Sequence, residues 1–556
     1  MNYNNFRFWL LFGLLYLFYW RLDRRRQNTL LLAASYIFYG AWDYRFLFLI
    51  LLSTIIDFIG GLGVAGVTLS SRRRRGLAAL LIGAAVLLTT NIHYDALASS
   101  VLAGRWTEAM AALPHQGRSW AISAAVLVAV LLYGACLPRL YGLPPERRRK
   151  LFLTLSMVAN LGILAFFKYC DFFVAGVVTL ARSLGLGELS WTTLNIVLPA
   201  GISFYTFQAM SYTIDIYRRQ AEPTDDFGDF ALFVSFFPHL VAGPIMRAHT
   251  LLPQVVNPRR DPRGTPVMRE GLILVLVGLF KKLVIADNMA PLANSVFFRF
   301  LDGHSAAVSG PEVLFGVYAF ALQIYGDFSG YSAIARGISK WLGFELVENF
   351  HLPYLATSPS DFWKRWHISL SSWLRDYLYI PLGGNRGGVW RQYRNLMLTM
   401  VLGGLWHGAG LTFIAWGTAH GIILCVYRAL GVRDDVAGRG WGRALARAAR
   451  IILMFHLVCL GWLFFRADNF QVAFSMLGAL VTRVHWVPEV MTPMLAEMLV
   501  MALIPLALEV AVDGERNLKR LMNAPVWAQC GLYIYIVTML TFLRAGHAQS
   551  FIYFQF

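Results

Sequence analysis

Three histidines in strongly apolar surroundings are the residues of this sequence best suited to chemistry. His407 and His420 lie in LMLTMVLGGLWHGAGLTFIAWGTAHG (396–421), and His367 lies in TSPSDFWKRWHISLSSWLRDYLYIPLGGNRGG (357–388). A neutral imidazole can accept the proton of a hydroxyl while the oxygen attacks an electrophile, which is general-base catalysis. An ionisable residue deep in a membrane segment is by default a functional candidate. We therefore treat these two stretches as the candidate site.

Each histidine also has a structural interpretation that the sequence leaves open. Glycines surround His407, at positions 403, 404, 408 and 410. They either leave room for a substrate or allow two helices to pack closely around an interhelical hydrogen bond of His407. For His367, which lies in a Trp-rich amphipathic segment, a structural hydrogen bond is at least as reasonable as a chemical role. Composition alone does not separate these alternatives.

The sequence lacks the patterns of several other enzyme classes. It contains no GxxxxGK[ST], no DxD, no HExxH and no histidine followed five residues later by an aspartate. The GxGxxG match at 61–66 ends a membrane span, so we interpret its glycines as helix packing rather than as a dinucleotide site. The five cysteines form no CxxC pair, so we expect neither a disulfide framework nor a metal site.

The composition indicates a polytopic membrane protein. Of the 556 residues 57% are hydrophobic and only 14% are charged, against about 25% charged residues in an ordinary soluble domain. The net charge of +18 comes from short basic runs between apolar segments. That distribution follows the positive-inside rule, in which basic loops stay in the cytoplasm. It reports topology, and we expect no nucleic-acid partner.

The elements that must position the histidines are apolar helices between these basic runs. An even number of spans between successive runs returns the chain to the same side of the membrane. The pattern predicts spans at about 28–41, 46–69, 77–93, 121–141, 151–184, 193–217, 395–411, 412–430, 451–466, 496–512 and 527–544. With the less regular middle of the chain, it predicts about a dozen membrane helices or more.

The apolar segment 229–246 does not fit this parity, because basic runs lie on both sides of it. Pro238 and Pro244 would interrupt a continuous helix. A re-entrant segment, helix-break-helix, resolves the conflict. Irregular backbone at membrane depth is tolerated only when it is buried in protein or lines a cavity. The sequence therefore predicts a cavity beside 229–246.

The stretch that contains His367 predicts an amphipathic helix. Ser358 followed by Pro359 is a typical helix start. Apolar residues then recur at steps of three and four, at Trp363, Trp366, Leu370, Trp373 and Tyr377, between charged residues. We expect this helix to begin at Ser358 and to lie at the cytoplasmic surface or line a mouth there.

At these stretches the chain resembles the membrane-bound O-acyltransferase (MBOAT) family, and within it the bacterial alginate and cellulose O-acetyltransferase branch. The motifs are FFPHLVAGPI (236–245), YGDFSGYSAIARG (325–337), ENFHLPYL (348–355), FWKRWHISLSSWLRDYLYIPLGG (362–384) and LGGLWHGAGLTFIAWGTAHG (402–421). The resemblance runs from about residue 30 to the C-terminus.

The resemblance implies an enzyme that transfers an acetyl group from acetyl-CoA to a hydroxyl, without a bound cofactor or a metal. His407 of the WHG motif would be catalytic, and His367 would be the second important position. The donor would enter from the cytoplasm and meet the acceptor in a central tunnel near His407. Further residues expected to line the substrates are Trp406, His420, Asp327, Trp366 and Arg375.

The acceptor implied by the resemblance is an exported polysaccharide of the alginate or cellulose type. A periplasmic acetyltransferase or accessory protein would complete the transfer, and the protein would lie in a bacterial inner membrane. The aromatic C-terminus 551–556 should lie at the outer mouth of the tunnel, where Phe551, Tyr553 and Phe556 would dock that partner. D-alanyl transfer to teichoic acid, a transporter and a non-enzymatic export subunit are the alternatives.

The expected fold is therefore an all-α polytopic membrane protein. It would have an MBOAT-like helical core with re-entrant segments, a central tunnel and amphipathic surface helices. We expect one integral membrane domain over 1–556. Within it, 1–150 would be peripheral helices, 193–430 the catalytic core that carries the motifs, and 451–556 the C-terminal helices.

The predicted topology can be tested at the basic run Arg72–Arg75. We expect a cysteine introduced at Ser71, in a variant without the native cysteines, to escape a membrane-impermeant maleimide in intact spheroplasts. It should react once the membrane is inverted, because the basic loops face the cytoplasm. Labelling in intact spheroplasts would place this loop outside and contradict the topology.

Overall fold

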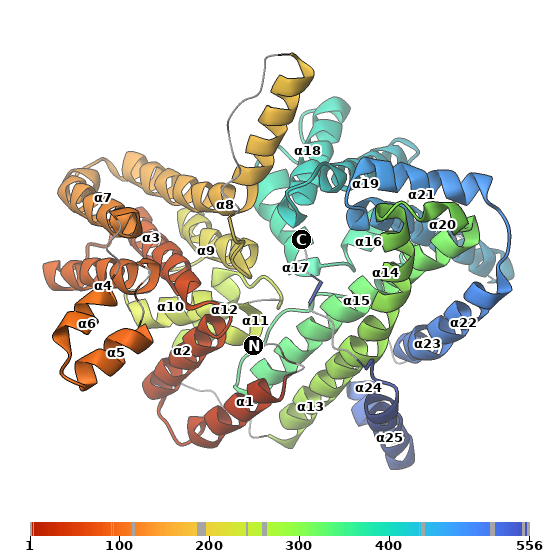
Figure 1. Ribbon diagram of the computed structural model, residues 1–556, viewed down its shortest axis with the longest axis horizontal. Helices are drawn as coiled ribbons and strands as arrows, with labels where there is room; N and C mark the ends of the chain where they lie inside the picture. Colours follow the sequence, from red (N-terminus) through yellow and green to blue (C-terminus); the bar gives the residue numbers. More distant parts are fainter. Residues whose placement is uncertain are drawn as a thin grey trace. The chain divides into compact units, whose positions relative to one another are not determined.

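The structure, a computed structural model, describes residues 3, 5–90, 92, 94–113, 117–185, 196–240, 243–257, 264–432, 434, 440–511, 518–546 and 551–552. Within these residues every regular element is helical (Figure 1). The prediction of an all-α membrane protein is confirmed.

Six helical segments of the described chain are long and apolar enough to cross a membrane. All of them coincide with predicted spans, and they are Tyr44–Ala65, Trp120–Tyr141, Pro145–Ser183, Leu411–Ala429, Gly440–Arg466 and Pro488–Ala511. The number is below the predicted dozen because other core helices are shorter or carry charges. Helix α15, for example, covers Gly310–Trp341 but contains Glu312, Asp327 and Arg336. The chain is nevertheless a multi-pass membrane protein.

The chain divides into two compact units. Unit 1 comprises 1–167, 195–241 and 246–259, and unit 2 comprises 168–194, 242–245 and 260–556. The helices of unit 1 are α1 (Phe6–Tyr19), α2 (Arg24–Gly40), α3 (Leu47–Ala65), α4 (Ser71–Thr89), α5 (Tyr94–Leu102), α6 (Trp106–Ala111), α7 (Gly117–Tyr141), the first part of α8 (Pro145–Ser183), α9 (Ile202–Tyr217), α10 (Phe227–Ser235), α11 (Phe237–Leu240) and α12 (Ala248–Val256).

Unit 2 contains the end of α8 and the later helices. These are α13 (Thr265–Phe280), the π-helical turn η2 (Lys281–Ala286), α14 (Asp287–Leu301), α15, α16 (Pro359–Trp363), α17 (Ile368–Leu374), α18 (Val389–His407), α19 (Leu411–Ala429), α20 (Gly440–Arg466), α21 (Phe470–Thr482), α22 (Pro488–Met498), α23 (Ile504–Ala511), α24 (Leu518–Met522) and α25 (Val526–Phe542). The segment predicted at 1–150 lies within unit 1, whereas unit boundaries cut through the segment predicted at 193–430. The predicted division stays a prediction.

The predicted break within 229–246 is present in the described part of that segment. Helix α10 ends at Ser235, Phe236 leaves the helical conformation, and α11 covers only Phe237–Leu240. Residues 241 and 242 lie outside the described residues. The break is held by polar contacts, because the hydroxyl of Tyr3 donates to the carbonyl of Pro238 over 2.7 Å. The helix-break-helix interpretation is confirmed here.

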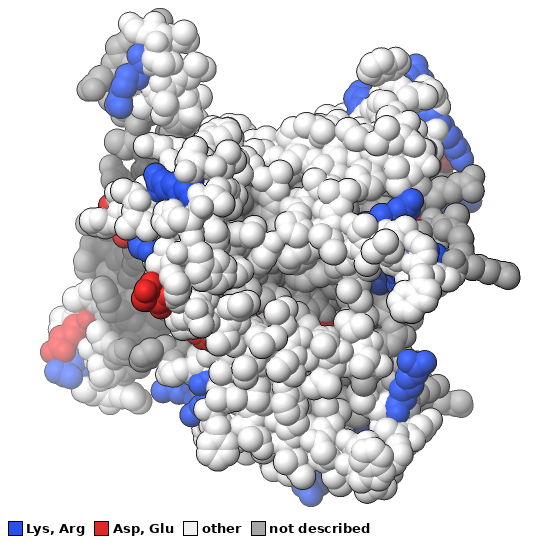
Figure 2. Space-filling view, turned by 90° about the vertical axis from the view of Figure 1, so that its right-hand side faces the viewer, with Lys and Arg blue, Asp and Glu red and all other residues white. Residues whose placement is uncertain are grey.

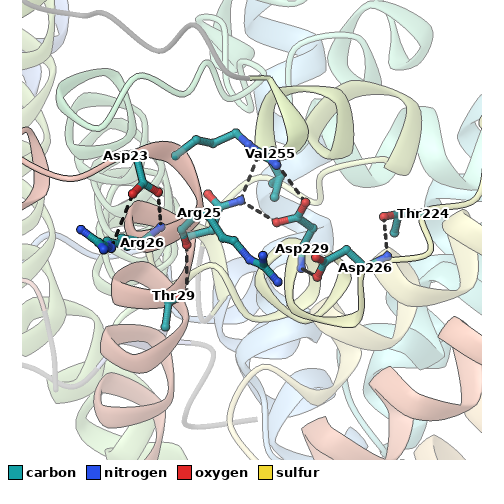
Figure 3. A network of polar contacts seen from close by, with 10 residues as sticks. Asp23, Arg25, Arg26, Thr29, Thr224, Asp226, Asp229 and Val255 are labelled. Carbon is teal, nitrogen blue, oxygen red and sulfur yellow. Dashed lines mark hydrogen bonds and ion pairs between the residues drawn. The ribbon is translucent and has the colours of Figure 1, made fainter. Parts of the chain in front are cut away.

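Asp229 and Asn28 together join three helices of unit 1. Its carboxylate accepts hydrogen bonds from Arg24 over 3.1 Å and from Asn28 over 2.6 Å, both on α2. The Asn28 amide also donates to the carbonyl of Val255 on α12. Figure 3 shows Asp229 at the start of α10, next to Asp226, whose side chain caps that helix. The Asp229 carboxylate thus ties α10 to α2, and Asn28 extends the network to α12.

Glycines bring α13 and α15 into close contact in unit 2. A Cβ built on Gly278 would lie 2.6 Å from the carbonyl oxygen of Gly330, and one on Gly337 would lie 2.6 Å from that of Gly271. Small residues at such positions let helix backbones approach in a membrane, where packing rather than the hydrophobic effect drives association. Helix α15 is buried over most of its length as a result.

The surface in Figure 2 is consistent with a surrounding bilayer. A broad part of this face carries almost no charged side chains, and Lys and Arg gather towards its edges. Uncharged surface of this extent is rare on soluble proteins and is expected where lipid tails make contact.

Replacing Asp229 tests the network in Figure 3. We expect Asp229→Ala to lower the free energy of unfolding by about 1–3 kcal/mol, because Asn28 and Arg24 lose a buried acceptor. Asp225→Asn is the matched control, since the Asp225 side chain is 74% exposed and should change stability by less than about 0.5 kcal/mol. Thermal unfolding in detergent measures both, and equal midpoints would contradict the role of Asp229.

Candidate active site

His407 is the last residue of α18. Gly408 follows in an extended conformation, and α19 begins at Leu411. The sequence analysis expected a span over 395–411 with His407 deep in it, but α18 ends at His407 and the chain reverses into α19. The imidazole is 4% exposed. His407 therefore lies in the interior, at a helix end rather than on a helix face.

Close packing of α18 on α19 fixes this turn (Figure 1). A Cβ built on Gly404 would lie 2.3 Å from the carbonyl oxygen of Phe413, and one on Gly408 would lie 2.2 Å from the ring of the same residue. The space beside these two glycines is filled by α19. For them the structure supports helix packing, one of the two interpretations that the sequence left open.

His367 lies at a break between two short helices. Helix α16 starts with Ser358 as its cap and Pro359 in its first turn, as predicted, but ends at Trp363. His367 then adopts the left-handed conformation, with φ 42° and ψ 54°, and α17 begins at Ile368. The single amphipathic helix predicted from the three-and-four spacing is therefore wrong. The break turns Trp366 inward, where it is 1% exposed.

Asn349 is the residue that holds this break, and sequence reasoning missed it. Its backbone carbonyl accepts the amide N–H of Ile368 over 2.9 Å. Its side-chain oxygen accepts the backbone N–H and the hydroxyl of Ser369, and lies 3.1 Å from Nδ1 of His367. An oxygen accepts from Nδ1 only when that nitrogen carries the proton. Neutral His367 therefore has its lone pair on Nε2.

Asp434 anchors the segment that precedes His367. Its carboxylate accepts from the hydroxyl of Ser358 over 2.5 Å and from the ammonium of Lys364 over 2.6 Å. Partial burial alone would raise the pKa of Asp434, but hydrogen bonds from Lys364 and Ser358 outweigh it, so the pKa of this carboxyl lies below its ordinary value. The segment is thus fixed at its start by Asp434 and at its end by Asn349.

The left-handed conformation of His367 and the helix end at His407 bring the two imidazoles together. Their ring centroids lie 6.4 Å apart, and Trp406 is in contact with both, at 6.0 Å and 5.0 Å. Trp416 and Phe465 pack edge-on against His407, at 5.0 Å and 5.5 Å. This arrangement places two imidazoles in a largely aromatic environment that holds their rings in defined orientations.

His420 lies next to this pair, separated from it by one residue. Its ring contacts Trp416, which also contacts His407, with centroid distances of 4.9 Å and 5.0 Å. Phe362 and Trp363 cover the other sides, at 5.9 Å and 5.2 Å. His420 is 1% exposed. It therefore supports Trp416 rather than meeting His407 directly.

The other predicted lining residues fall in three places. Trp366 packs against Trp462 in the same aromatic cluster, at 4.9 Å. Asp327 is buried in an ion pair with Lys282, with 2.8 Å between nitrogen and oxygen. Arg375 has a side chain that is 62% exposed and pairs with its neighbour Asp376. Of these three, only Trp366 belongs to the cluster around the histidines.

The described part of the C-terminus lies inside unit 2. Phe551 is fully buried and packs on Phe328, whose ring contacts His367 at 4.6 Å. The backbone N–H of Ile552 donates to Asp327 over 2.7 Å. A side chain buried in this way offers no surface to a partner, so the docking role predicted for Phe551 is corrected. Tyr553 and Phe556 lie outside the described residues.

Lys168 and Tyr169, near the middle of α8, reach the last turn of α18. The ammonium of Lys168 donates to the carbonyls of Trp406 and His407, over 2.5 Å and 3.1 Å, and the hydroxyl of Tyr169 donates to that of Leu405 over 2.8 Å. Sequence reasoning missed both residues. A lysine inside the predicted span 151–184 was the available signal, because such charges are costly in a membrane.

Comparison with known proteins agrees with the motifs around these histidines. The model of the membrane-bound O-acyltransferase family matches residues 223–460. A Pseudomonas putida protein named "Probable alginate O-acetylase AlgI" is 41% identical over 373 residues, which cover 66% of this chain and 73% of that protein. The chain belongs to the membrane-bound O-acyltransferase family.

Two further relatives show how far the similarity extends. The Azotobacter vinelandii protein of the same printed name is 44% identical over 338 residues, or 60% of this chain and 64% of that protein. A peptidoglycan O-acetyltransferase from Helicobacter pylori is 37% identical over 361 residues, or 61% and 66%. The matched part thus spans a little under two thirds of the Azotobacter relative.

A cavity of about 520 Å³ lies elsewhere in this MBOAT chain. It is lined by residues of α13, η2, α23, α24 and α25, among them Leu274, Lys281, Leu508 and Ile536, and by none of the three histidines. The tunnel expected beside His407 has no counterpart in this cavity and stays a prediction.

The packing of α18 on α19 makes a stability prediction. Gly404→Ala should lower the free energy of unfolding by about 1–3 kcal/mol, because its methyl group would overlap a backbone carbonyl that cannot rotate away. Gly442→Ala in α20 is the control, since a Cβ there meets nothing within 4 Å. Thermal unfolding compares the two variants. An unchanged midpoint for Gly404→Ala would show that the two helices separate easily.

Proposed function

We propose that this protein is an O-acetyltransferase that moves an acetyl group from acetyl-CoA to a hydroxyl of an exported bacterial polysaccharide. The single observation that carries the proposal is the pair of buried imidazoles, with ring centroids 6.4 Å apart, inside the family motifs. Acyl transfer from a thioester to a hydroxyl needs a proton acceptor and a group that helps to hold the two reactants close together. One imidazole of this pair can serve as the base and the other can help to position the reactants.

In the proposed reaction His407 is the general base. Its neutral imidazole takes the proton as the hydroxyl oxygen forms a bond to the thioester carbonyl carbon. The carbon–sulfur bond then breaks, the acetyl group stays on the acceptor oxygen, and the thiolate of coenzyme A leaves. The proton on His407 passes to that thiolate, which regenerates the base. No cofactor and no metal take part in these steps.

His367 would position the reactants from its fixed orientation. Since Nδ1 lies 3.1 Å from the side-chain oxygen of Asn349, the lone pair of neutral His367 is on Nε2. That atom can accept a hydrogen bond from the acceptor hydroxyl or from the imidazole N–H of His407. In either case Asn349 would control the alignment of the proton transfer, although it touches no reacting atom.

The acceptor and the direction of transfer rest on the relatives and on membrane topology. Relatives named for alginate and for peptidoglycan support a bacterial exported polysaccharide as the acceptor class, and alginate or cellulose remains the proposed type. Acetyl-CoA would reach the site from the cytoplasmic side of an inner membrane. An extracytoplasmic accessory protein would carry the group to the polymer.

Replacing His407 tests the proposal. With radiolabelled acetyl-CoA, purified protein, candidate polymers and extracts that contain extracytoplasmic partners, we expect His407→Ala and His407→Asn to lose transfer by about 10²–10⁴-fold, because neither replacement is basic. His304→Ala is the control, since His304 is exposed and should leave the rate unchanged. Near-normal turnover in His407→Asn would refute the general-base role, and no turnover of acetyl-CoA by the wild type with any polymer would refute the function.

A further inference from the structure

The C-terminus of α18 lacks the usual means of satisfying its backbone. The last carbonyl groups of a helix have no partners within it, and a glycine in the left-handed conformation often closes the end. Gly408 is the residue after His407, but it is extended, with φ −158° and ψ 152°. The carbonyls of the last turn therefore need donors from elsewhere in the chain.

Two consecutive residues of α8 supply these donors. Tyr169 donates to the carbonyl of Leu405, and Lys168 donates to those of Trp406 and His407. Three successive carbonyls, ending at the one that belongs to His407 itself, are thus bound by side chains from a segment more than two hundred residues earlier. All five residues belong to unit 2.

The positive charge of Lys168 suits the C-terminus of α18. The C-terminus of a helix carries a partial negative charge, so a cation there is stabilised. The ammonium also lies 5.8 Å from the ring centroid of Trp406, within the range of a cation–π contact. Burying an ammonium is costly unless it is well hydrogen-bonded. Lys168 is only partly buried, and its hydrogen bonds to two carbonyls offset part of that cost.

We infer that Lys168 and Tyr169 are positioning residues that set where α18 ends and thereby aim the imidazole of His407. His407 is the terminal residue of the helix, so its backbone angles depend on the carbonyls that the two side chains bind. A shift of its ring by about 1 Å would disturb proton transfer by about 10²-fold. The inference rests on the proposed function, because the orientation of the imidazole affects the rate only if His407 takes part in the reaction.

A purely structural anchor would act differently. It would lower the melting temperature and the amount of folded protein, and the folded fraction would keep its turnover. A positioning role lowers kcat in protein that is folded and still binds the donor. The comparison of kcat with KM and with the melting temperature therefore separates the two.

Three single replacements test the inference in the full-length protein. Lys168→Met keeps the length of the side chain and removes its charge and donors. Lys168→Arg retains both, and Tyr169→Phe removes one hydroxyl. Thr179→Val is the matched control, because Thr179 is exposed and its hydroxyl donates to a carbonyl of the same helix, that of Ala175.

We expect Lys168→Met to lower kcat by about 10–100-fold, with the KM for acetyl-CoA within about twofold of the wild type. Tyr169→Phe should lower kcat by about 2–10-fold, the loss of a single hydrogen bond. Lys168→Arg should recover most of the rate that Lys168→Met loses, and Thr179→Val should behave as the wild type. The melting temperatures should agree within a few degrees.

Two results would overturn the inference. One is a kcat of Lys168→Met within twofold of the wild type. The other is a fall in rate that follows the loss of folded protein, with full activity in the folded fraction. An inactive wild type would instead defeat the proposed function, and with it the basis of this inference.

Discussion

The hydrogen bonds of Asn349 are the interaction on which the candidate site depends. This one residue binds the chain on the far side of His367 through its backbone carbonyl and binds His367 and Ser369 through its side chain. Because the region is buried, leaving any one of these groups without a partner would cost about 1–3 kcal/mol. The left-handed conformation of His367 is held by these bonds, and with it the inward direction of both Trp366 and the imidazole.

A second constraint brings His407 to that imidazole. Helices α18 and α19 approach so closely at Gly404 and Gly408 that no methyl group would fit there. The turn between them places His407 at a helix end, where its backbone carbonyl accepts a hydrogen bond from Lys168. The aromatic residues around the two rings then restrict their rotation. Backbone contacts therefore bring His367 and His407 together, and packing against aromatic rings then fixes the orientation of their imidazoles.

Several buried charges in unit 2 are paired with charges of opposite sign, as is common inside membrane proteins. Lys282 lies 2.8 Å from Asp287 and from Asp327, and Lys281 lies 2.7 Å from Glu509. Asp327 also accepts a hydrogen bond from the backbone N–H of Ile552, so this part of the C-terminal segment belongs to the same interior. These groups stabilise the frame around the histidines, and they explain why charged residues in the middle of the chain are compatible with a membrane fold.

The sequence by itself determined the fold class, the six long spans, the presence of a helix break within 229–246 and the start of α16, because each depends on local composition, spacing or a capping residue. It also singled out the three histidines as candidates. It did not determine the break at His367, the end of α18 at His407, or the roles of Asn349, Lys168 and Tyr169. Those features depend on contacts between segments far apart in the chain, from 18 residues for Asn349 and His367 to 239 for Lys168 and His407. A three-and-four pattern of apolar residues predicts a continuous helix, and only a hydrogen bond from a distant segment interrupts it. The tertiary structure therefore decided how the histidines meet.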